Sequence, residues 1–460
     1  MKRREFLSGL AAGFVAATGH RAAFAAAQRA PSRRPNVIII FTDDQGTLDL
    51  NCYGSDDLHT PNLDALAKRG VRFTQFYGGS AVCSPSRAAL LTGRYPHRAG
   101  VPGNAQSRPP FGTGRGLSES EVTIAEMLKA VGYRTGHFGK WHLGGNPGPN
   151  GSGFDESFGF LGGCIDKWSH FNYGGAAWGS PPKRHDWYHN GKEVWESGTH
   201  SGDLIVRGAT PFMETNADKP FFMYVAFGTP HYPMQPYNKY WQHYESLPEP
   251  RRAYAALVST MDEQVGRILA KVDELGLREN TLIIFQSDQG HSTEARANYG
   301  GGNAGSYRGA KASLFEGGLR VPAAVSLPGR IPQGEVRSQF CTGCDWLPTI
   351  AEFCGAPLPE RKIDGVSILT VIGSAEAPDP HTVWHWQLHN QWAVREGQWK
   401  LIVNANDTTD GRDVTVLKEP FLANLAEDPT ERTSFAMRRP DLVKRLTELH
   451  ERWAAEVRAD

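Results

Sequence analysis

Asn36-Val-Ile-Ile-Ile-Phe-Thr42 is a continuous apolar run that leads directly into Asp43 and Asp44. A short run of β-branched and aromatic residues without alternation is typical of a strand buried on both faces. Three further runs of this kind lie at residues 133–135, 221–227 and 281–286. Helical patterns separate them, at residues 62–69, 123–131 and 254–275. This alternation predicts an α/β fold with a large, mainly parallel or mixed sheet flanked by helices.

A polar cluster follows each of the four runs. Asp43 and Asp44 follow the first, Lys140 and His142 lie in the cluster after the second, and the third leads into Thr229-Pro-His231. The fourth leads into Ser287-Asp-Gln-Gly290. Because ligands bind beyond the carboxyl ends of the strands in such sheets, we expect these side chains to form one site.

The sequence changes in character after about residue 370. Short tryptophan-rich runs at residues 383–386, 391–395 and 398–403 predict an antiparallel meander, and residues 440–457 predict a helix packed across it. We therefore predict a catalytic domain over residues 31–370 and a smaller α+β subdomain over residues 371–460.

The first 30 residues read as an export signal. Met1 to Arg4 is basic, residues 6–18 are mildly apolar, and Ala23-Phe24-Ala25 suits cleavage. A helix docked on the domain is the alternative. Arg3-Arg4-Glu5-Phe6-Leu7 resembles a twin-arginine motif, although its flanks depart from it and leave the ordinary secretory route open. We predict an exported protein, periplasmic or secreted.

Composition excludes several classes of protein. The 49 lysines and arginines equal the 49 aspartates and glutamates, so no net positive field would attract nucleic acid. No stretch is apolar enough to span a membrane. Of the six cysteines, Cys341 and Cys344 have CxxC spacing, but no second pair completes a zinc site. Buried thiols are the expected state, with a disulfide between these two as the alternative.

The acidic residues point to an oxygen-bound metal ion. Asp43, Asp44 and Asp288 with the amide of Gln289 would form a hard cage suited to Ca²⁺, with Mg²⁺ as the second choice. Taken alone, an aspartate pair more often forms a turn or a helix cap. The gathering of these acids with basic residues at one sheet edge favours the metal.

Cys83 opens the run Cys83-Ser-Pro-Ser-Arg-Ala-Ala-Leu-Leu-Thr-Gly93, which predicts a short helix ending at its glycine. Free N–H groups at the start of a helix favour negative charge, so Cys83 would lie where a negatively charged group is stabilised. A lone cysteine is more often a small buried apolar residue, and a thiolate nucleophile with a histidine base is a second alternative.

An ordered set of motifs resembles the type I sulfatases, arylsulfatase-like enzymes of the alkaline phosphatase superfamily. Cys83-Ser-Pro-Ser-Arg87 with Leu91-Thr-Gly-Arg94 resembles their signature. The resemblance spans nearly the whole mature chain and includes the following segments: Asp43-Asp44, Gly139-Lys-Trp-His-Leu143, Thr229-Pro-His231, Ser287-Asp-Gln-Gly290, Gly309-Ala-Lys311, Glu316-Gly-Gly318 and Asn424-Leu-Ala-Glu-Asp-Pro429.

The resemblance implies an alkaline-phosphatase-like fold and a sulfuric ester hydrolase in which a formylglycine-generating enzyme converts Cys83 to formylglycine. One hydroxyl of the hydrated aldehyde would attack sulfur, and His231 or Lys311 would protonate the leaving alcohol. His142 would then take a proton from the second hydroxyl, which expels sulfate.

The resemblance also implies ligands and partners. Lys140, Lys311 and the metal would hold the sulfuryl oxygens, and Arg87 would fix the nucleophile. The modified Cys83 would join the metal ligands. The family commonly has asparagine where this chain has Gln289, so the amide keeps its oxygen but reaches one methylene further.

Two clusters of aromatic residues bear on the choice of substrate. Residues 168–195 carry Trp168, His170, Tyr173, Trp178, His185, Trp187, Tyr188 and His189, and a second cluster holds Trp384, His385, Trp386 and His389. Flat aromatic faces suit sugar rings, which predicts a sulfated carbohydrate, but the same residues could simply pack long loops. Two further functions stay open. One is a phosphodiester or phosphonate monoester hydrolase, and the second, with Cys83 unmodified, is a protein that binds sulfated glycans.

Overall fold

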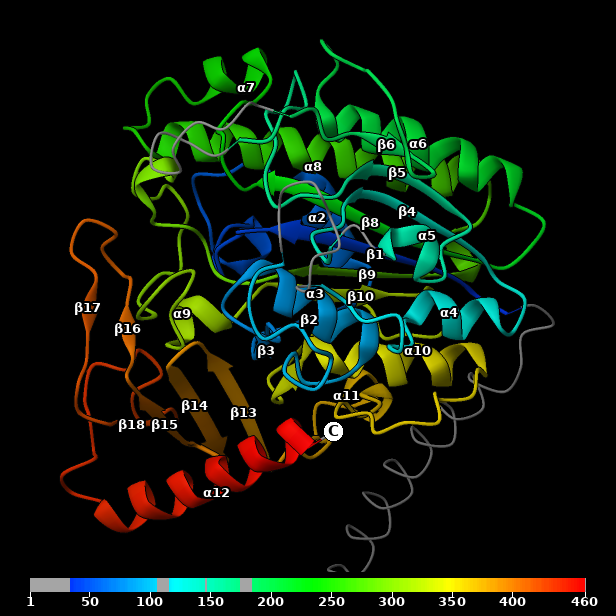
Figure 1. Ribbon diagram of the computed structural model, residues 1–460. Helices are drawn as coiled ribbons and strands as arrows, with labels where there is room; N and C mark the ends of the chain where they lie inside the picture. The colour runs from blue at the N-terminus through cyan, green and yellow to red at the C-terminus, as the bar shows by residue number, and fades with distance from the viewer. Residues whose placement is uncertain (1–33, 106–115, 145–146, 174–183, 460) are drawn as a thin grey trace, which may run out of the picture.

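The computed structural model describes residues 34–105, 116–144, 147–173 and 184–459 (Figure 1). The predicted export signal and Trp178 lie outside these described residues. Across the described ranges, no helix is both long and apolar enough to cross a bilayer.

A ten-stranded mixed sheet runs through the molecule in the order β11-β2-β10-β9-β1-β8-β4-β5-β6-β7. β1 (Asn36–Asp43) lies between β8 (Phe221–Pro230) and β9 (Thr281–Ser287) and is parallel to both. β4 (Arg134–Lys140) is parallel to β8 and to β5 (Glu156–Phe160). The outer strands are β2 (Val71–Phe73), β6 (Tyr188–His189), β7 (Lys192–Glu193), β10 (Ala323–Ser326) and β11 (Glu335–Arg337). The parallel centre and mixed edges confirm the predicted fold class.

Helices cover both faces of this sheet, as Figure 1 shows. Ile38 and Ile40 of β1 pack into one apolar cluster, whereas Val37, Ile39 and Phe41 pack into another on the opposite face. Each fully buried side chain of this size contributes about 1.5–3 kcal/mol to folding. The helices of the first cluster are α2 (Pro61–Lys68), α6 (Ser201–Thr215) and α8 (Arg251–Glu274). Those of the second are α3 (Cys83–Thr92), α4 (Ile124–Lys129), α10 (Trp346–Cys354) and α11 (Leu369–Gly373).

A small antiparallel sheet with a final helix forms the C-terminal part of the chain. Its strands, in spatial order, are β13 (Val383–Leu388), β14 (Gln391–Glu396), β15 (Trp399–Val403) and β18 (Phe421–Asn424), and α12 (Pro440–Ala459) packs across them. Trp384, Trp386 and Trp453 share an apolar cluster with Tyr77 and Ala89 of the larger part. The meander and its helix are as predicted, while the boundary at residue 370 stays a prediction.

Short elements complete the described chain. They are β3 (Phe76–Tyr77), β12 (Cys341–Thr342), β16 (Asn406–Asp407), β17 (Thr415–Val416), α5 (Gly148–Gly151), α7 (Asn238–His243), α9 (Glu316–Leu319) and α11 (Leu369–Gly373), with 3₁₀ turns η1 (Asn51–Tyr53), η3 (Arg278–Asn280), η4 (Ala295–Ala297) and η5 (Gly343–Asp345).

Two strands are longer than their apolar runs predict. β4 continues five residues beyond Thr135 to Lys140, and β8 continues three residues beyond Phe227 to Pro230. Gly136 and Gly139 are poor strand formers, but β5 and β8 bind β4 on both edges, and this pairing overrides local propensity. Lys140 is therefore the last residue of a strand, which fixes its position more firmly than a loop would.

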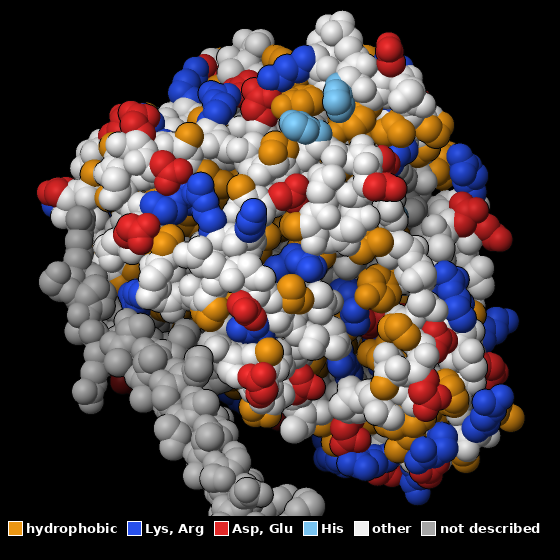
Figure 2. Space-filling model, turned by 180° about the vertical axis from the view of Figure 1, so that it is seen from behind, with side chains coloured by type: hydrophobic (Ala, Val, Ile, Leu, Met, Phe, Trp, Pro, Cys, Tyr) orange, Lys and Arg blue, Asp and Glu red, His pale blue; other side chains and the backbone are white. Residues whose placement is uncertain are grey.

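The state of the cysteines and the distribution of charged side chains agree with what the sequence predicts. All six cysteines lie within the described part of the chain and are free thiols, and Cys341 and Cys344 are buried. Figure 2 shows basic and acidic side chains interspersed over the face opposite to that of Figure 1, with no extended basic patch on that face.

Candidate active site

The carboxyl ends of four adjacent parallel strands meet at one edge of the sheet. Asp43 ends β1, Lys140 ends β4, His231 follows β8 and Asp288 follows β9. The strand order β9-β1-β8-β4 places these residues beside one another. The expectation that the polar clusters share one edge is confirmed.

Asp43, Asp44, Asp288 and Gln289 form a buried acidic cluster. Asp288 Oδ1 accepts from the backbone N–H groups of Asp44 and Gln289, each at 3.0 Å. Gln289 Nε2 donates to Asp44 Oδ1. Asp44 has a φ of 61°, a left-handed conformation that turns the chain at the end of β1. Burial and the neighbouring Asp43 raise the pKa of Asp288 well above its ordinary value.

Cys83 lies against this cluster as the first residue of α3. Its Sγ is 3.4 Å from Asp43 Oδ1 and 3.5 Å from Gln289 Nε2, and the side chain is 1% exposed. Burial and the adjacent Asp43 raise the pKa of the thiol. An unmodified Cys83 would therefore stay protonated and would be a poor nucleophile, despite its position at the helix start.

Three buried cations pair with the three carboxylates. Lys140 Nζ is 2.5 Å from Asp43 Oδ2, and Lys311 Nζ is 2.9 Å from Asp44 Oδ2. Arg87 Nη2 is 3.2 Å from Asp288 Oδ2. Burial alone would raise the pKa of Asp43, but Lys140 and other neighbouring cations hold it well below its ordinary value. Asp43 is thus ionised, and each of the three carboxylates faces a buried cation.

Two histidines complete the set of predicted residues. His231 Nε2 is 3.5 Å from Asp44 Oδ2, and its Nδ1 is 2.8 Å from the carbonyl of Tyr232, which fixes the ring. His142 has a φ of 53°, and its carbonyl accepts from Ser84 Oγ at 2.6 Å. Burial lowers the pKa of both imidazoles well below their ordinary value, so both are neutral.

The donor set fits a hard divalent cation. Ligand atoms of Asp43, Asp44, Cys83 and His231 all lie within 4.8 Å of one another. Gln289 Oε1 is buried without a hydrogen-bond partner, while Nε2 faces Asp44 and Cys83. Rotating this amide by half a turn would place an oxygen beside the carboxylates, as an oxygen-seeking ion requires.

The sequence reasoning missed several neighbours of the site. Lys167 is buried and donates to the carbonyl of Gly228, and Tyr224 Oη accepts from Arg87 Nη1 at 3.3 Å. Glu294 Oε2 lies 3.8 Å from Lys311 Nζ. Tyr224 lies inside an apolar run and Lys167 beside Trp168, so only their places in the fold reveal them.

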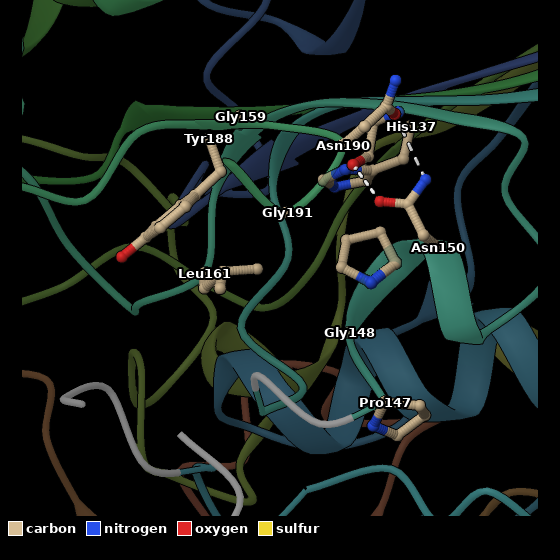
Figure 3. A pocket seen from close by; sticks show the side chains of 11 residues that line it. His137, Pro147, Gly148, Asn150, Gly159, Leu161, Tyr188, Asn190 and Gly191 are labelled. Atoms are coloured by element: carbon tan, nitrogen blue, oxygen red, sulfur yellow. Dashed lines mark hydrogen bonds between the residues drawn. The ribbon is translucent and has the colours of Figure 1, made fainter. Parts of the chain in front are cut away.

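A separate cavity of about 160 Å³ lies over β5 beside α5 (Figure 3). None of the predicted catalytic or metal-binding residues lines it, whereas Tyr188 of the first aromatic cluster does. Asn150 Nδ2 donates to Asn190 Oδ1 at 3.2 Å, and Ser157 Oγ donates to Asn150 Oδ1 at 2.7 Å. It is smaller than ordinary ligand pockets of about 300–1,000 Å³, and several of its polar groups bond one another. We assign it no function.

The model of the family described as Sulfatase matches residues 35–356. The chain belongs to the sulfatase family. Arylsulfatase from Hemicentrotus pulcherrimus is 36% identical over 382 residues, covering 81% of this chain and 68% of that protein. Human arylsulfatase A is 33% identical over 440 residues, covering 88% of this chain and 84% of that protein.

The solved structures agree with this family. The structure of Ps i-CgsB in complex with k-i-k-neocarrahexaose has a TM-score of 0.80 and 31% sequence identity, and the match covers 92% of this sulfatase and 93% of that chain. Together with the geometry of the site, these findings identify a sulfuric ester hydrolase with an alkaline-phosphatase-like fold.

Proposed function

We propose that this sulfatase hydrolyses the sulfate monoester of a saccharide to an alcohol and inorganic sulfate, using a formylglycine formed from Cys83. The observation that carries the proposal is the position of Cys83, buried against Asp43 in a cluster lined by Lys140 and Lys311. A protonated thiol in this place has no evident use. A hydrated aldehyde would supply paired hydroxyls, one to attack sulfur and one to be deprotonated when sulfate leaves.

We propose that Asp43, Asp44, Asp288, Gln289 and the modified Cys83 hold Ca²⁺. The carboxylate and amide oxygens favour Ca²⁺ or Mg²⁺ over zinc. The bound cation would stabilise negative charge on the sulfuryl oxygens and on an attacking hydroxyl.

The remaining residues supply charge and proton transfer. Lys140 and Lys311 would hold the sulfuryl oxygens, and Arg87 would orient the nucleophile from its bond to Asp288. Burial keeps His142 neutral, so it could accept the proton that accompanies sulfate release.

Either Lys311 or His231 would protonate the leaving alcohol. His231 is neutral, and its Nδ1–H can donate to the carbonyl of Tyr232, which leaves Nε2 as an acceptor. Lys311 keeps its proton, because its pKa is raised by Asp44 despite burial. This difference favours Lys311 as the acid.

The saccharide assignment now rests on relatives rather than on the aromatic clusters. Trp187, Trp384 and Trp386 are fully buried and pack the core, so the packing interpretation is correct for them. Trp168 and Trp195 remain exposed. A solved relative binds a neocarrahexaose, and the N-acetylgalactosamine-6-sulfatase of Canis lupus familiaris is 33% identical over 94% of this chain.

Two measurements test the proposed function. Mass spectrometry of the Cys83 peptide, purified from a host with a formylglycine-generating enzyme, should show the aldehyde, and an intact thiol in active protein would refute the mechanism. A panel of aryl sulfate, sulfated saccharides, aryl phosphonate and phosphodiester should give the highest rates on sulfate esters. Hydrolysis of aryl sulfate without hydrolysis of any sulfated saccharide would remove the carbohydrate assignment. Preference for the phosphonate or phosphodiester would remove the sulfate monoester assignment.

We further propose that the protein is exported through residues 1–30, in a periplasmic or secreted form. Replacing Arg3 and Arg4 by lysine should retain the protein in the cytoplasm if the twin-arginine route is used. Unchanged export of this double variant would indicate the ordinary secretory route.

A further inference from the structure

The segment that carries Lys311 has a backbone that local sequence does not favour. Gly309 and Ala312 both lie in the left-handed region, with φ of 79° and 68°, and Ala312 has a side chain that disfavours it. Residues 309–313 belong to no helix or strand. Contacts from elsewhere must therefore hold this turn in place.

Most of those contacts come from the C-terminal part of the chain. Thr408 Oγ1 accepts from the Ala310 N–H at 3.0 Å and donates to the Lys311 carbonyl at 3.1 Å. One hydroxyl thus bonds the N–H of the residue before Lys311 and the carbonyl of Lys311 itself. The Gly309 N–H donates to Thr409 Oγ1 at 2.7 Å, and Gln391 Nε2 donates to the Ala312 carbonyl at 2.8 Å.

Residues of the larger, N-terminal part of the chain bond the other side of the turn that carries Lys311. The Lys311 N–H donates to the carbonyl of His291 at 2.9 Å, and the Ala312 N–H donates to that of Ala81 at 2.9 Å. Thr408 is itself fixed, because its carbonyl accepts from Thr293 Oγ1 at 2.8 Å. The Lys311 backbone therefore lies between two elements that are more than a hundred residues apart in sequence.

We propose that Thr408, which directly follows β16 in the hairpin formed with β17, is a positioning residue for Lys311. Figure 1 shows this hairpin beside α9, the helix that follows the Lys311 turn. The fixed turn directs Lys311 Nζ to Asp44 Oδ2 at 2.9 Å. Thr408 acts only through the lysine. This inference rests on the proposed role of Lys311 in holding the sulfuryl group.

The test is a double-mutant cycle with an activated aryl sulfate. Thr408→Val keeps the shape of the side chain but loses both hydrogen bonds, and kcat/KM should fall about 10- to 100-fold, as expected for displacement of a catalytic group by about 1 Å. Thr408→Ser keeps the hydroxyl and should restore most of this loss. In a Lys311→Ala background, Thr408→Val should change the rate by less than about twofold, because its route of action is already removed.

Controls separate this inference from the proposed function. Thr415→Val, at an exposed position on β17 of the same hairpin, should leave the rate unchanged. An inactive wild type would contradict the proposed function and the inference together. An active wild type with an equally active Thr408→Val, or an equal loss in both backgrounds, would overturn the inference alone. If Thr408→Val does not fold, Thr408→Ala, which also removes both hydrogen bonds, replaces it in the same cycle.

Discussion

Replacing Lys140 by methionine removes one charge from the centre of the site while nearly keeping the volume. Lys140 and Asp43 are completely buried, and their ion pair is 2.5 Å long. Breaking a buried pair on one side typically costs about 3–5 kcal/mol, because the remaining charge is left without compensation. We expect a loss of this size in the free energy of unfolding, measured by urea denaturation in a chelating buffer.

Calcium should reduce that loss. A divalent cation among Asp43, Asp44 and Asp288 would compensate the charge that Lys140 no longer balances, so Ca²⁺ should stabilise the Lys140→Met variant more than the wild type. Hydrolysis of an aryl sulfate should still be about 10²–10³-fold slower, the usual effect of removing one group that stabilises transition-state charge.

Lys400 offers a matched control for the loss of a buried lysine. It is also completely buried, and its Nζ lies 2.9 Å from Glu316 Oε1 and 3.0 Å from Glu431 Oε1, in a separate ionic cluster. Lys400→Met should lose comparable stability with no added response to Ca²⁺. If Ca²⁺ stabilises Lys140→Met no more than the wild type, the assignment of the cation to this cluster is wrong.

Three further results are expected. Gln289→Leu should weaken Ca²⁺ binding, measured by calorimetry, about tenfold to a hundredfold, and unchanged affinity would exclude this side chain as a ligand. Trp453→Ala, which removes the ring that stacks on His385, should cost about 3–5 kcal/mol of unfolding free energy, and a loss below about 1 kcal/mol would show that α12 packs weakly. Burial lowers the pKa of His385 to about 3 and that of His450 to about 4, so their stabilising contribution is complete above pH 6.5 and is lost as the pH falls toward 4. His385→Phe should make stability less dependent on pH over this range, and an unchanged dependence would contradict the role of His385.

The strands that place the site could be predicted because their signal is local. Residues 36–42 and 281–286 are uninterrupted apolar runs, and the structure places β1 and β9 over them. The gathering of Asp43, His231 and Asp288 then follows from the rule that parallel strands end at one edge. The position of Cys83 followed from its proline- and glycine-bounded helix.

The parts that could not be predicted depend on contacts between distant segments. Nothing near Thr408 marks it as a partner of Lys311, since the two are brought together only by the packing of the C-terminal hairpin. The extension of β4 to Lys140 depends on pairing with β5 and β8, not on its own glycine-rich sequence. Tryptophan is equally suited to a core and to a sugar-binding surface, so Trp384 and Trp386 could not be placed by composition alone.

The charges of the site indicate whether a bound cation would act on folding or on substrate binding. Asp43, Asp44 and Asp288 each face one buried cation, which is Lys140, Lys311 and Arg87 respectively, so three ionised carboxylates would be balanced by three positive charges. Because each carboxylate already has a cationic partner, we expect the wild type to fold without a further cation, unlike a zinc finger. A bound divalent ion would give the cluster a net charge of about +2, which suits an anionic sulfate ester. We therefore expect the cation to act mainly on the substrate in the wild type. When Lys140 is removed, we expect the stability of the fold to depend on the cation as well.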